Sequence, residues 1–234
     1  MRAVLDHIVE HAPTLRSYWF RPDVPLRFTA GEYTEVYLQH TPHDIRGERR
    51  KFTVSSSPTD PLVSITVTFV PDSGSSFKAA LAALRPGDSV HMAETMGEFV
   101  LPKDPTIPLT FTAVGAGITP VMSIVAWLDA TGEKRDVQII HGARLPSTLL
   151  DQALFAEYAQ KYMPIVTQPD DTWSGMAGQL TASRILDVTN NPSAQRYYLS
   201  GPEAMIKKLA DNLIDLGIDK NAIVTDLFLG VADE

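Results

Sequence analysis

The feature of this sequence that most constrains its fold is a change of rhythm near residue 104. Before that point, short runs of β-forming residues are separated by turn residues; after it, such runs alternate with longer helical segments. Antiparallel strands can be joined by tight turns, whereas parallel strands need a crossover connection, usually a helix. The sequence therefore predicts two domains with different kinds of sheet, residues 1–103 and residues 104–234.

The first domain is predicted to be an antiparallel β-barrel. Its expected strands are short, rich in β-branched and aromatic residues, and bounded by Gly, Pro or Asp. They cover residues 3–10, 17–21, 33–39, 51–55, 63–70 and 89–93. Six short strands at this spacing are typical of a small barrel or sandwich.

The second domain is predicted to be an α/β domain with a five-stranded parallel sheet. The expected strands cover residues 109–114, 137–141, 165–167, 196–199 and 222–227, and the expected helices cover residues 119–130, 147–160, 180–187 and 202–216. This alternation places helices on both faces of the sheet. Ligands bind such sheets beyond the carboxyl ends of the strands, near the switch in strand order.

Composition restricts the chemistry of the chain. Its 234 residues include no cysteine, which excludes disulfides, thiolate nucleophiles and Cys-ligated metal clusters. The net charge of −8 argues against nucleic-acid binding, which needs a basic face. Any redox chemistry is therefore expected to use an organic cofactor or a separate partner protein.

Two patterns are expected to be coincidental. His7-Ile-Val-Glu-His11 matches a zinc-peptidase pattern that requires a helix, but its surroundings are typical of a strand, so no metal site is expected. Residues 107–128 carry no charge and are long enough to span a bilayer. Glycine and proline interrupt them, so a buried strand, a turn and a helix are expected instead. No signal peptide is recognisable, and a cytoplasmic location is expected.

The stretch Arg50-Lys-Phe-Thr-Val-Ser-Ser-Ser-Pro58 combines a cation, an aromatic ring and several hydroxyls. In a strand, side chains two positions apart share a face, so Arg50 and Phe52 are expected on one face and Thr53 on the other. Such a stretch can hold a planar cofactor that carries phosphate. An amphipathic strand entering a Ser-Pro turn has the same pattern.

Three further segments place glycine or serine at the start of a predicted helix: Gly74-Ser-Ser-Phe77, Gly115-Ala-Gly-Ile-Thr-Pro120 and Ser200-Gly-Pro202. A helix N-terminus presents free N–H groups and the positive end of the helix dipole, and both favour phosphate. Glycines would also let the backbone approach a pyrophosphate. Each segment alone equally fits an ordinary N-cap or turn.

Together these segments resemble the ferredoxin–NADP reductase superfamily of flavoproteins, and the resemblance covers nearly the whole chain. Residues 50–56 are similar to the family's R-x-[YF]-[ST]-x-x-S flavin motif, and residues 115–120 to its G-x-G-x-T-P nicotinamide motif. Residues 200–202 resemble its C-G-P segment, with serine in place of cysteine. Residues 97–99 and 226–230 are similar to the segments that close its flavin barrel and end its last strand.

The resemblance implies a role for each matching residue. Arg50 would bind the FAD pyrophosphate with its guanidinium fork, Phe52 would lie against the isoalloxazine ring, and Thr53 would hydrogen-bond N5, the atom that accepts hydride. The other residues implied in binding FAD are Val54, Ser55, Ser56, Gly74, Ser75, Ser76 and Phe77. Those implied in binding the nicotinamide nucleotide are Gly115, Gly117, Thr119, Pro120, Gly201 and Pro202, with Ser200 beside the reacting carbon.

The activity implied is that of an FAD-dependent oxidoreductase that takes hydride from NADH or NADPH. Because no iron–sulfur domain is expected in the chain, the electrons would pass to a separate protein such as a ferredoxin or flavodoxin. Two alternatives stay open: an NAD(P)H:flavin reductase with loosely bound flavin, and a non-catalytic FAD electron-transfer subunit, which Ser200 favours. NADH is favoured because Asp170 and Asp171 would repel the 2′-phosphate of NADPH, and Arg144 is the one cation expected to bind it.

Overall fold

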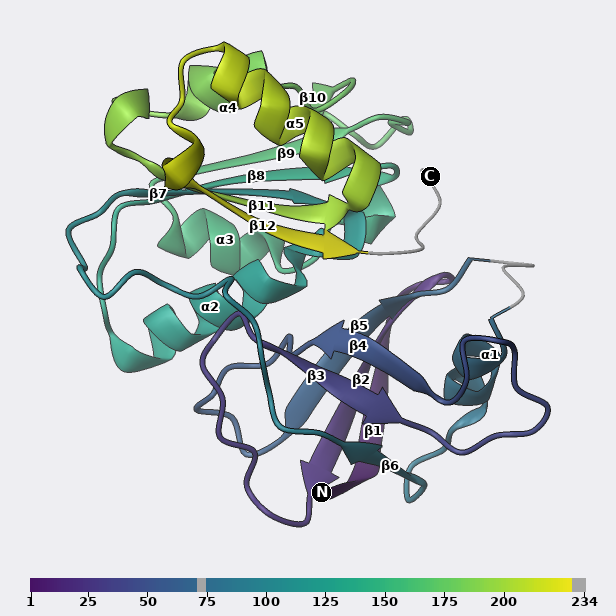
Figure 1. Ribbon diagram of the computed structural model, residues 1–234. Coiled ribbons are helices and arrows are strands. Elements are labelled where there is room, and N and C mark those ends of the chain that lie inside the picture. The colour runs from purple at the N-terminus through teal and green to yellow at the C-terminus, as the bar shows by residue number, and fades with distance from the viewer. Residues whose placement is uncertain (71–74, 229–234) are drawn as a thin grey trace.

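Two six-stranded sheets organise the chain in the computed structural model, which describes residues 1–70 and 75–228. Figure 1 shows the two sheets in separate domains that meet along one side. The first sheet is antiparallel, in the order β4-β3-β6-β1-β2-β5. Its strands are β1 (Arg2–Ala12), β2 (Leu15–Pro22), β3 (Tyr33–Tyr37), β4 (Arg49–Thr53), β5 (Val63–Thr68) and β6 (Ser89–Met92). All six predicted strands of this domain are confirmed.

The two ends of this sheet join to form a barrel. Beyond β4, Val54 forms a bridge with Ile65 of β5, and the Ser55 N–H donates to the Ser64 carbonyl at 2.9 Å. The interior is filled by alternate residues of the strands, because successive strand residues point to opposite faces. Its largest members include Tyr18, Phe20, Ile65, Phe77, Leu81 and Met92. Two of them come from helix α1 (Ser76–Ala83), which lies beside the barrel (Figure 1).

The second sheet is wholly parallel, in the order β10-β9-β8-β7-β11-β12. Its strands are β7 (Leu109–Val114), β8 (Val137–Ala143), β9 (Lys161–Val166), β10 (Met176–Ala177), β11 (Arg196–Pro202) and β12 (Ile223–Phe228). Helices α2 (Thr119–Thr131) and α3 (Gln152–Tyr158) cover one face, and α4 (Ala182–Val188) and α5 (Glu203–Asp215) cover the other (Figure 1). Short 3₁₀ helices are η1 (Gly115–Ile118), η2 (Pro146–Thr148), η3 (Pro192–Ala194) and η4 (Lys220–Ala222).

The parallel sheet corrects the prediction in two places. It has six strands rather than five, because the two-residue β10 pairs with β9 at one edge. Two exposed residues carry no hydrophobic pattern, so the sequence gives no sign of this strand. The helix predicted over residues 147–160 is also divided into η2 and α3 by Asp151, whose φ of 47° is left-handed. Strand β9 consequently begins at Lys161, earlier than expected.

The strand order reverses at β7, which lies between β8 and β11. The chain first adds β8 on one side of β7 and later adds β11 on the other side, so β7 and β11 flank the switch point. The turn that leaves β7 is η1, the segment with the two glycines Gly115 and Gly117. The fold thus brings two of the predicted binding segments, residues 115–120 and 200–202, to the same edge of the sheet.

The two domains share an interface with both polar and aromatic contacts. Ser123 on α2 donates to the Ser56 carbonyl at 2.7 Å, and the Tyr198 hydroxyl donates to the Val100 carbonyl at 2.7 Å. The Phe99 ring packs edge-on against Tyr198 with centroids 5.0 Å apart. These contacts hold the end of β4 opposite the carboxyl ends of β11 and β12.

The two coincidental patterns occur in the expected elements. His7 and His11 lie on strand β1, where the His7 ring stacks on Trp19 and His11 hydrogen-bonds Ser17 at 2.7 Å. Among the described residues, no group of three or more His, Cys, Asp or Glu side chains is placed to hold a metal ion. Residues 107–128 include β7, η1 and part of α2. Within residues 1–70 and 75–228, no helix is both long and apolar enough to cross a membrane.

Candidate functional site

Three polar side chains from both domains meet at the interface. Thr53 ends β4, and Ser200 and Asp226 lie opposite each other on β11 and β12. Ser200 Oγ donates to Asp226 Oδ2 at 3.4 Å, and the Thr53 hydroxyl lies close enough to the Asp226 carboxyl to lower its pKa. Thr53 and Ser200, the two residues predicted to be catalytic, are therefore joined by an acid to which the sequence analysis assigned no role.

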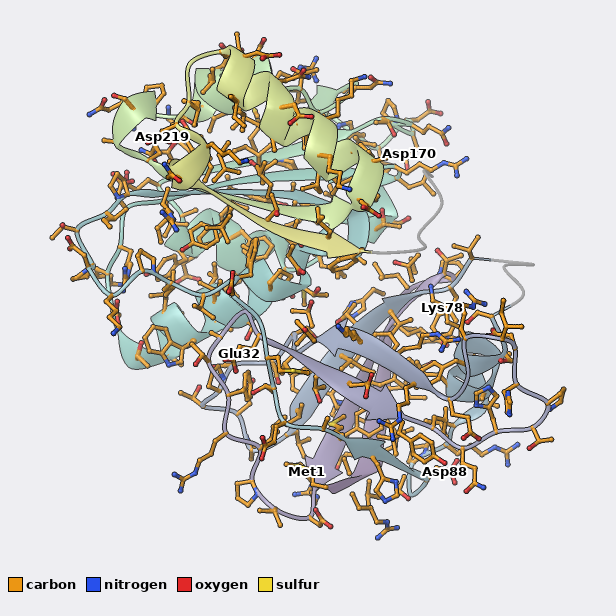
Figure 2. All side chains as sticks on the ribbon, viewed as in Figure 1. Met1, Glu32, Lys78, Asp88, Asp170 and Asp219 are labelled. Atoms are coloured by element: carbon orange, nitrogen blue, oxygen red, sulfur yellow. The ribbon has the colours of Figure 1, made fainter. Side chains whose placement is uncertain are left out.

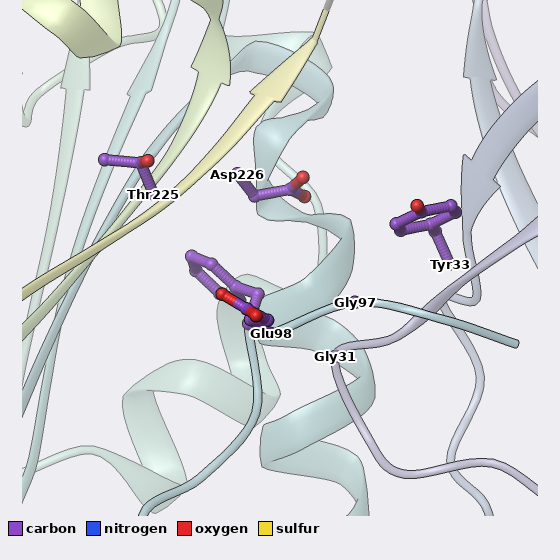
Figure 3. A pocket seen from close by; sticks show the side chains of 7 residues that line it. Gly31, Tyr33, Gly97, Glu98, Thr225 and Asp226 are labelled. Atoms are coloured by element: carbon purple, nitrogen blue, oxygen red, sulfur yellow. The ribbon is translucent and has the colours of Figure 1, made fainter.

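Asp226 is an unusual acid because it is half-buried. Burial raises its pKa to about 6, although the hydrogen bonds from Ser200 and Thr53 act in the opposite direction. Figure 3 shows its side chain reaching from β12 toward Tyr33 of β3. It lines a pocket of about 270 Å³ between the domains, together with residues of β3, β12 and the segment 97–99. The carboxyl can therefore gain or lose a proton near neutral pH.

Strand β4 has the predicted alternation. Phe52 faces Phe77 of α1 with ring centroids 5.8 Å apart, and the Arg50 guanidinium lies 5.3 Å from the centre of the same Phe77 ring. Thr53 points the other way, to Asp226. Val54 is fully buried in the barrel interior, where its side chain packs in the core.

The two serines after Val54 use their hydroxyls within the protein. Ser55 Oγ lies 2.8 Å from Ser64 Oγ and 3.0 Å from Thr66 Oγ1, and Ser56 Oγ accepts from the Ser64 N–H at 3.0 Å. These bonds fix the path of the chain between β4 and β5. Both serines thus position the strand that carries Thr53.

Arg50 and the start of α1, both predicted to bind flavin phosphate, donate to one carboxylate of the protein itself, that of Asp44. The Ser76 N–H donates to Asp44 Oδ2 at 3.1 Å, and Arg50 Nη2 donates to Asp44 Oδ1 at 3.2 Å. Ser75 caps the helix by accepting from the Lys78 N–H at 3.3 Å. Lys78, labelled in Figure 2, donates from Nζ to the Thr68 carbonyl at 2.6 Å. Gly74, also predicted to bind FAD, lies outside the described residues.

The predicted nicotinamide segments lie side by side at the switch point. A Cβ atom on Gly117 would lie 2.3 Å from the Ser200 carbonyl oxygen, so only glycine permits this approach of η1 to β11. Thr119 Oγ1 donates to the Ala116 carbonyl at 3.0 Å and Pro120 occupies the first turn of α2, so both stabilise the turn. Gly201 and Pro202 end β11 beside it.

One histidine that the sequence analysis left without a role supports this turn. His141 on β8 is fully buried, and its Nε2 atom lies 3.3 Å from the Gly115 carbonyl oxygen. Burial lowers the pKa of His141 to about 4, so the ring is neutral at pH 7 and can donate to that carbonyl. A histidine inside a buried parallel strand is the sequence signal that could have identified it.

Arg144 lies apart from these groups, just beyond β8. Its Nε atom donates to Gln168 Oε1 at 3.0 Å, which connects it to the loop after β9 that contains Asp170. The Thr172 hydroxyl and N–H hydrogen-bond Asp170 and lower the pKa of that carboxyl, so it stays ionised. The hydrogen bond to Gln168 therefore ties Arg144 to the start of the loop that carries Asp170 and Asp171.

Comparison with known proteins finds relatives of similar sequence over nearly the whole chain. Residues 111–211 match the family described as oxidoreductase NAD-binding domain. Over 240 residues the chain is 25% identical to the phenol hydroxylase P5 protein of Acinetobacter pittii and 26% identical to the phenol 2-monooxygenase reductase component of a Pseudomonas species. Each alignment covers 99% of this chain but 66% of the relative, just under two thirds of its length.

Solved structures share the whole fold. A ferredoxin NADP⁺ reductase from Neisseria gonorrhoeae with bound FAD and NADP has a TM-score of 0.82 at 20% identity, covering 97% of this chain and 98% of that one. A cytochrome P450 reductase from Amycolatopsis has a TM-score of 0.83 at 23% identity, covering 97% of this chain and 70% of that one. The barrel and the parallel sheet together form the fold that these two solved structures share. The chain is similar to these proteins in fold over nearly its whole length, and residues 111–211 carry the match to the oxidoreductase NAD-binding domain.

Proposed function

We propose that the protein is an NAD(P)H-dependent flavoprotein reductase that passes electrons through FAD to a separate acceptor protein. The observation that carries this proposal is the contact of Thr53 and Ser200 with Asp226. It places the end of the flavin-motif strand against the end of the nicotinamide-motif strand. The proposed division into a flavin domain of residues 1–103 and a nicotinamide domain of residues 104–234 follows from the same arrangement.

The residues present fit a flavin at both ends. At the ring end, the Thr53 hydroxyl offers a donor beside the half-buried Asp226, whose pKa is raised to about 6. At the phosphate end, a carboxylate occupies the cluster of Arg50 and the Ser76 N–H, so that cluster binds an anion. When bound, FAD would accept a hydride from the nicotinamide nucleotide and release its electrons one at a time. The protein would orient the two rings and exclude water between the domains.

The acceptor is proposed to be a protein of a monooxygenase or a ferredoxin-type partner. One relative is, by its name, the reductase component of phenol 2-monooxygenase, which supports an acceptor of the first kind. Arg46, Arg49 and Lys51 lie exposed near the site and would favour an acidic partner. Arg49 also donates to Glu35 at 3.2 Å, so this surface is only partly positive.

Anaerobic mixing of the flavin-loaded protein with NADH, and separately with NADPH, tests the proposal. Bleaching of the flavin absorbance by either nucleotide is expected, with NADH the faster. If neither nucleotide bleaches the flavin, the reductase assignment is wrong and the protein is a non-catalytic electron-transfer subunit. Loss of flavin on desalting would instead favour an NAD(P)H:flavin reductase, a reading supported by the carboxylate in the phosphate cluster.

Thr53→Val is expected to slow flavin reduction about tenfold or more while leaving flavin affinity nearly unchanged, because it removes one preorganised donor from the site. The measurement is single-turnover reduction by NADH. Thr34→Val is the matched control, since Thr34 is also buried, on the neighbouring strand β3, but donates to the Ala93 carbonyl at 3.0 Å. Equal rates for Thr53→Val and the control would contradict the role proposed for Thr53.

Arg144→Ala is expected to weaken NADPH-driven reduction about tenfold and to change NADH-driven reduction little, because a guanidinium binds phosphate strongly. The ratio of kcat/KM for the two nucleotides measures this effect. An equal loss with both nucleotides would mean that Arg144 does not contact the 2′-phosphate.

A further inference from the structure

Arg50 and the Ser76 N–H form the phosphate cluster, the group of donors predicted to bind the flavin phosphates. A side chain from the protein's own loop between β3 and β4 occupies this cluster. The Asp44 carboxylate accepts the Ser76 N–H at the start of α1 at 3.1 Å and an Arg50 N–H at 3.2 Å. Both donors are those predicted to bind flavin phosphate. A carboxylate and a phosphate oxygen compete for the same donors, because both are anionic acceptors of charge-assisted hydrogen bonds.

Several bonds hold Asp44 in this position. Its own N–H donates to Ser76 Oγ at 2.9 Å, and that hydroxyl also contacts His40 Nε2 at 2.9 Å. Arg46 donates to Asp44 through both its backbone N–H and its guanidinium, at 2.8 Å and 2.7 Å. These bonds, with that of Arg46 foremost, hold the pKa of Asp44 well below its usual range, so the carboxylate is ionised at neutral pH.

Arg50 also organises this loop. Its Nη1 atom donates to the carbonyls of Arg46 at 2.8 Å, Gly47 at 3.0 Å and Arg49 at 2.6 Å. The guanidinium thus binds the loop backbone on one edge and Asp44 on the other. A flavin phosphate that pairs with Arg50 must replace Asp44, and the loop must change to release it.

We propose that Asp44 is a specificity-determining residue of the flavin site, an internal competitor that offsets the contribution of the flavin phosphates to binding. When a flavin phosphate replaces the Asp44 carboxylate, one anion is exchanged for another, so the binding free energy gains little. A flavin without phosphate leaves Asp44 in place, so its binding free energy loses nothing. The affinities for FAD and for riboflavin are therefore closer than an open phosphate cluster would make them. This inference rests on the proposed flavin site and adds what sets its selectivity.

The test compares the dissociation constants of FAD and riboflavin, measured by flavin fluorescence with flavin-free protein. In Asp44→Ala the affinity for FAD is expected to rise about tenfold, the equivalent of one charge-assisted hydrogen bond, with riboflavin unchanged. Asp44→Asn, which keeps the shape and an acceptor, is expected to shift the ratio in the same direction. Asp88→Ala is the matched control, because Asp88 accepts the Arg85 N–H at 2.7 Å in a turn outside this cluster.

Amide hydrogen exchange gives a second readout. In the wild-type protein, FAD is expected to speed exchange of the Asp44 amide, and riboflavin is expected to leave it slow. Unchanged FAD-to-riboflavin ratios in both Asp44 variants, or an Asp44 amide that FAD leaves protected, would overturn the inference while leaving the proposed function intact. If neither flavin binds wild type or variants, the proposed function fails first and the inference fails with it.

Discussion

Gly117→Ala is expected to destabilise the protein by about 3 kcal/mol and to abolish most flavin reduction by NADH. The added Cβ would lie 2.3 Å from the Ser200 carbonyl oxygen, 2.5 Å from its carbonyl carbon and 2.7 Å from Gly201 Cα. All three are backbone atoms of β11, which is paired with β7 and β12. Because β11 is paired on both sides, moving that strand alone cannot relieve the clash, so η1 and the start of α2 must shift away from Ser200.

Gly142→Ala is the matched control for this substitution. Gly142 lies on β8 of the same sheet, and a Cβ there would meet Leu180 side-chain atoms at 3.4 Å and 3.5 Å, which is ordinary contact. Denaturant unfolding and single-turnover reduction of both variants separate the two positions. Similar stability and rate in Gly117→Ala and Gly142→Ala would refute the close-packing argument.

Local patterns were sufficient to predict the segments that form this site. The alternation in residues 50–54 predicted β4 and its two faces, and the Gly115–Gly117 turn predicted the start of α2. Both signals depend on neighbours in the chain: strand periodicity in one case, and glycine followed by a helix start in the other. The order of the motifs then indicated that the segments act together.

Contacts between distant residues could not be predicted in the same way. Asp44 meets Ser76, 32 positions away, yet in the sequence it is one of several polar residues in a turn-rich stretch. Asp226 follows a threonine in a strand, and its raised pKa depends on burial by both domains. The short strand β10 depends wholly on pairing with β9. In each case contacts between distant residues determine the feature, and local secondary-structure propensity does not encode these contacts.

Asp226→Asn is expected to remove a pH dependence of stability that the wild-type protein carries between about pH 4 and pH 6. The pKa of Asp226 is raised in the folded state from 3.8 to about 6, chiefly by burial. The folded state therefore holds this proton more tightly than the unfolded state does. Wild-type stability falls as pH rises through this window, by up to about 3 kcal/mol at 1.36 kcal/mol per pH unit, and stays lower above it.

The free energy of unfolding, measured in urea at several pH values, checks this sign. Asp226→Asn is expected to match wild type near pH 4 and to be the more stable protein at pH 8. Asp170→Asn is the control with the opposite sign, because Thr172 lowers the pKa of Asp170. The wild-type protein is expected to be more stable than Asp170→Asn at high pH and to lose that advantage on acidification. If the difference in unfolding free energy between wild type and Asp226→Asn does not change with pH, burial between Thr53 and Ser200 does not raise the pKa of Asp226.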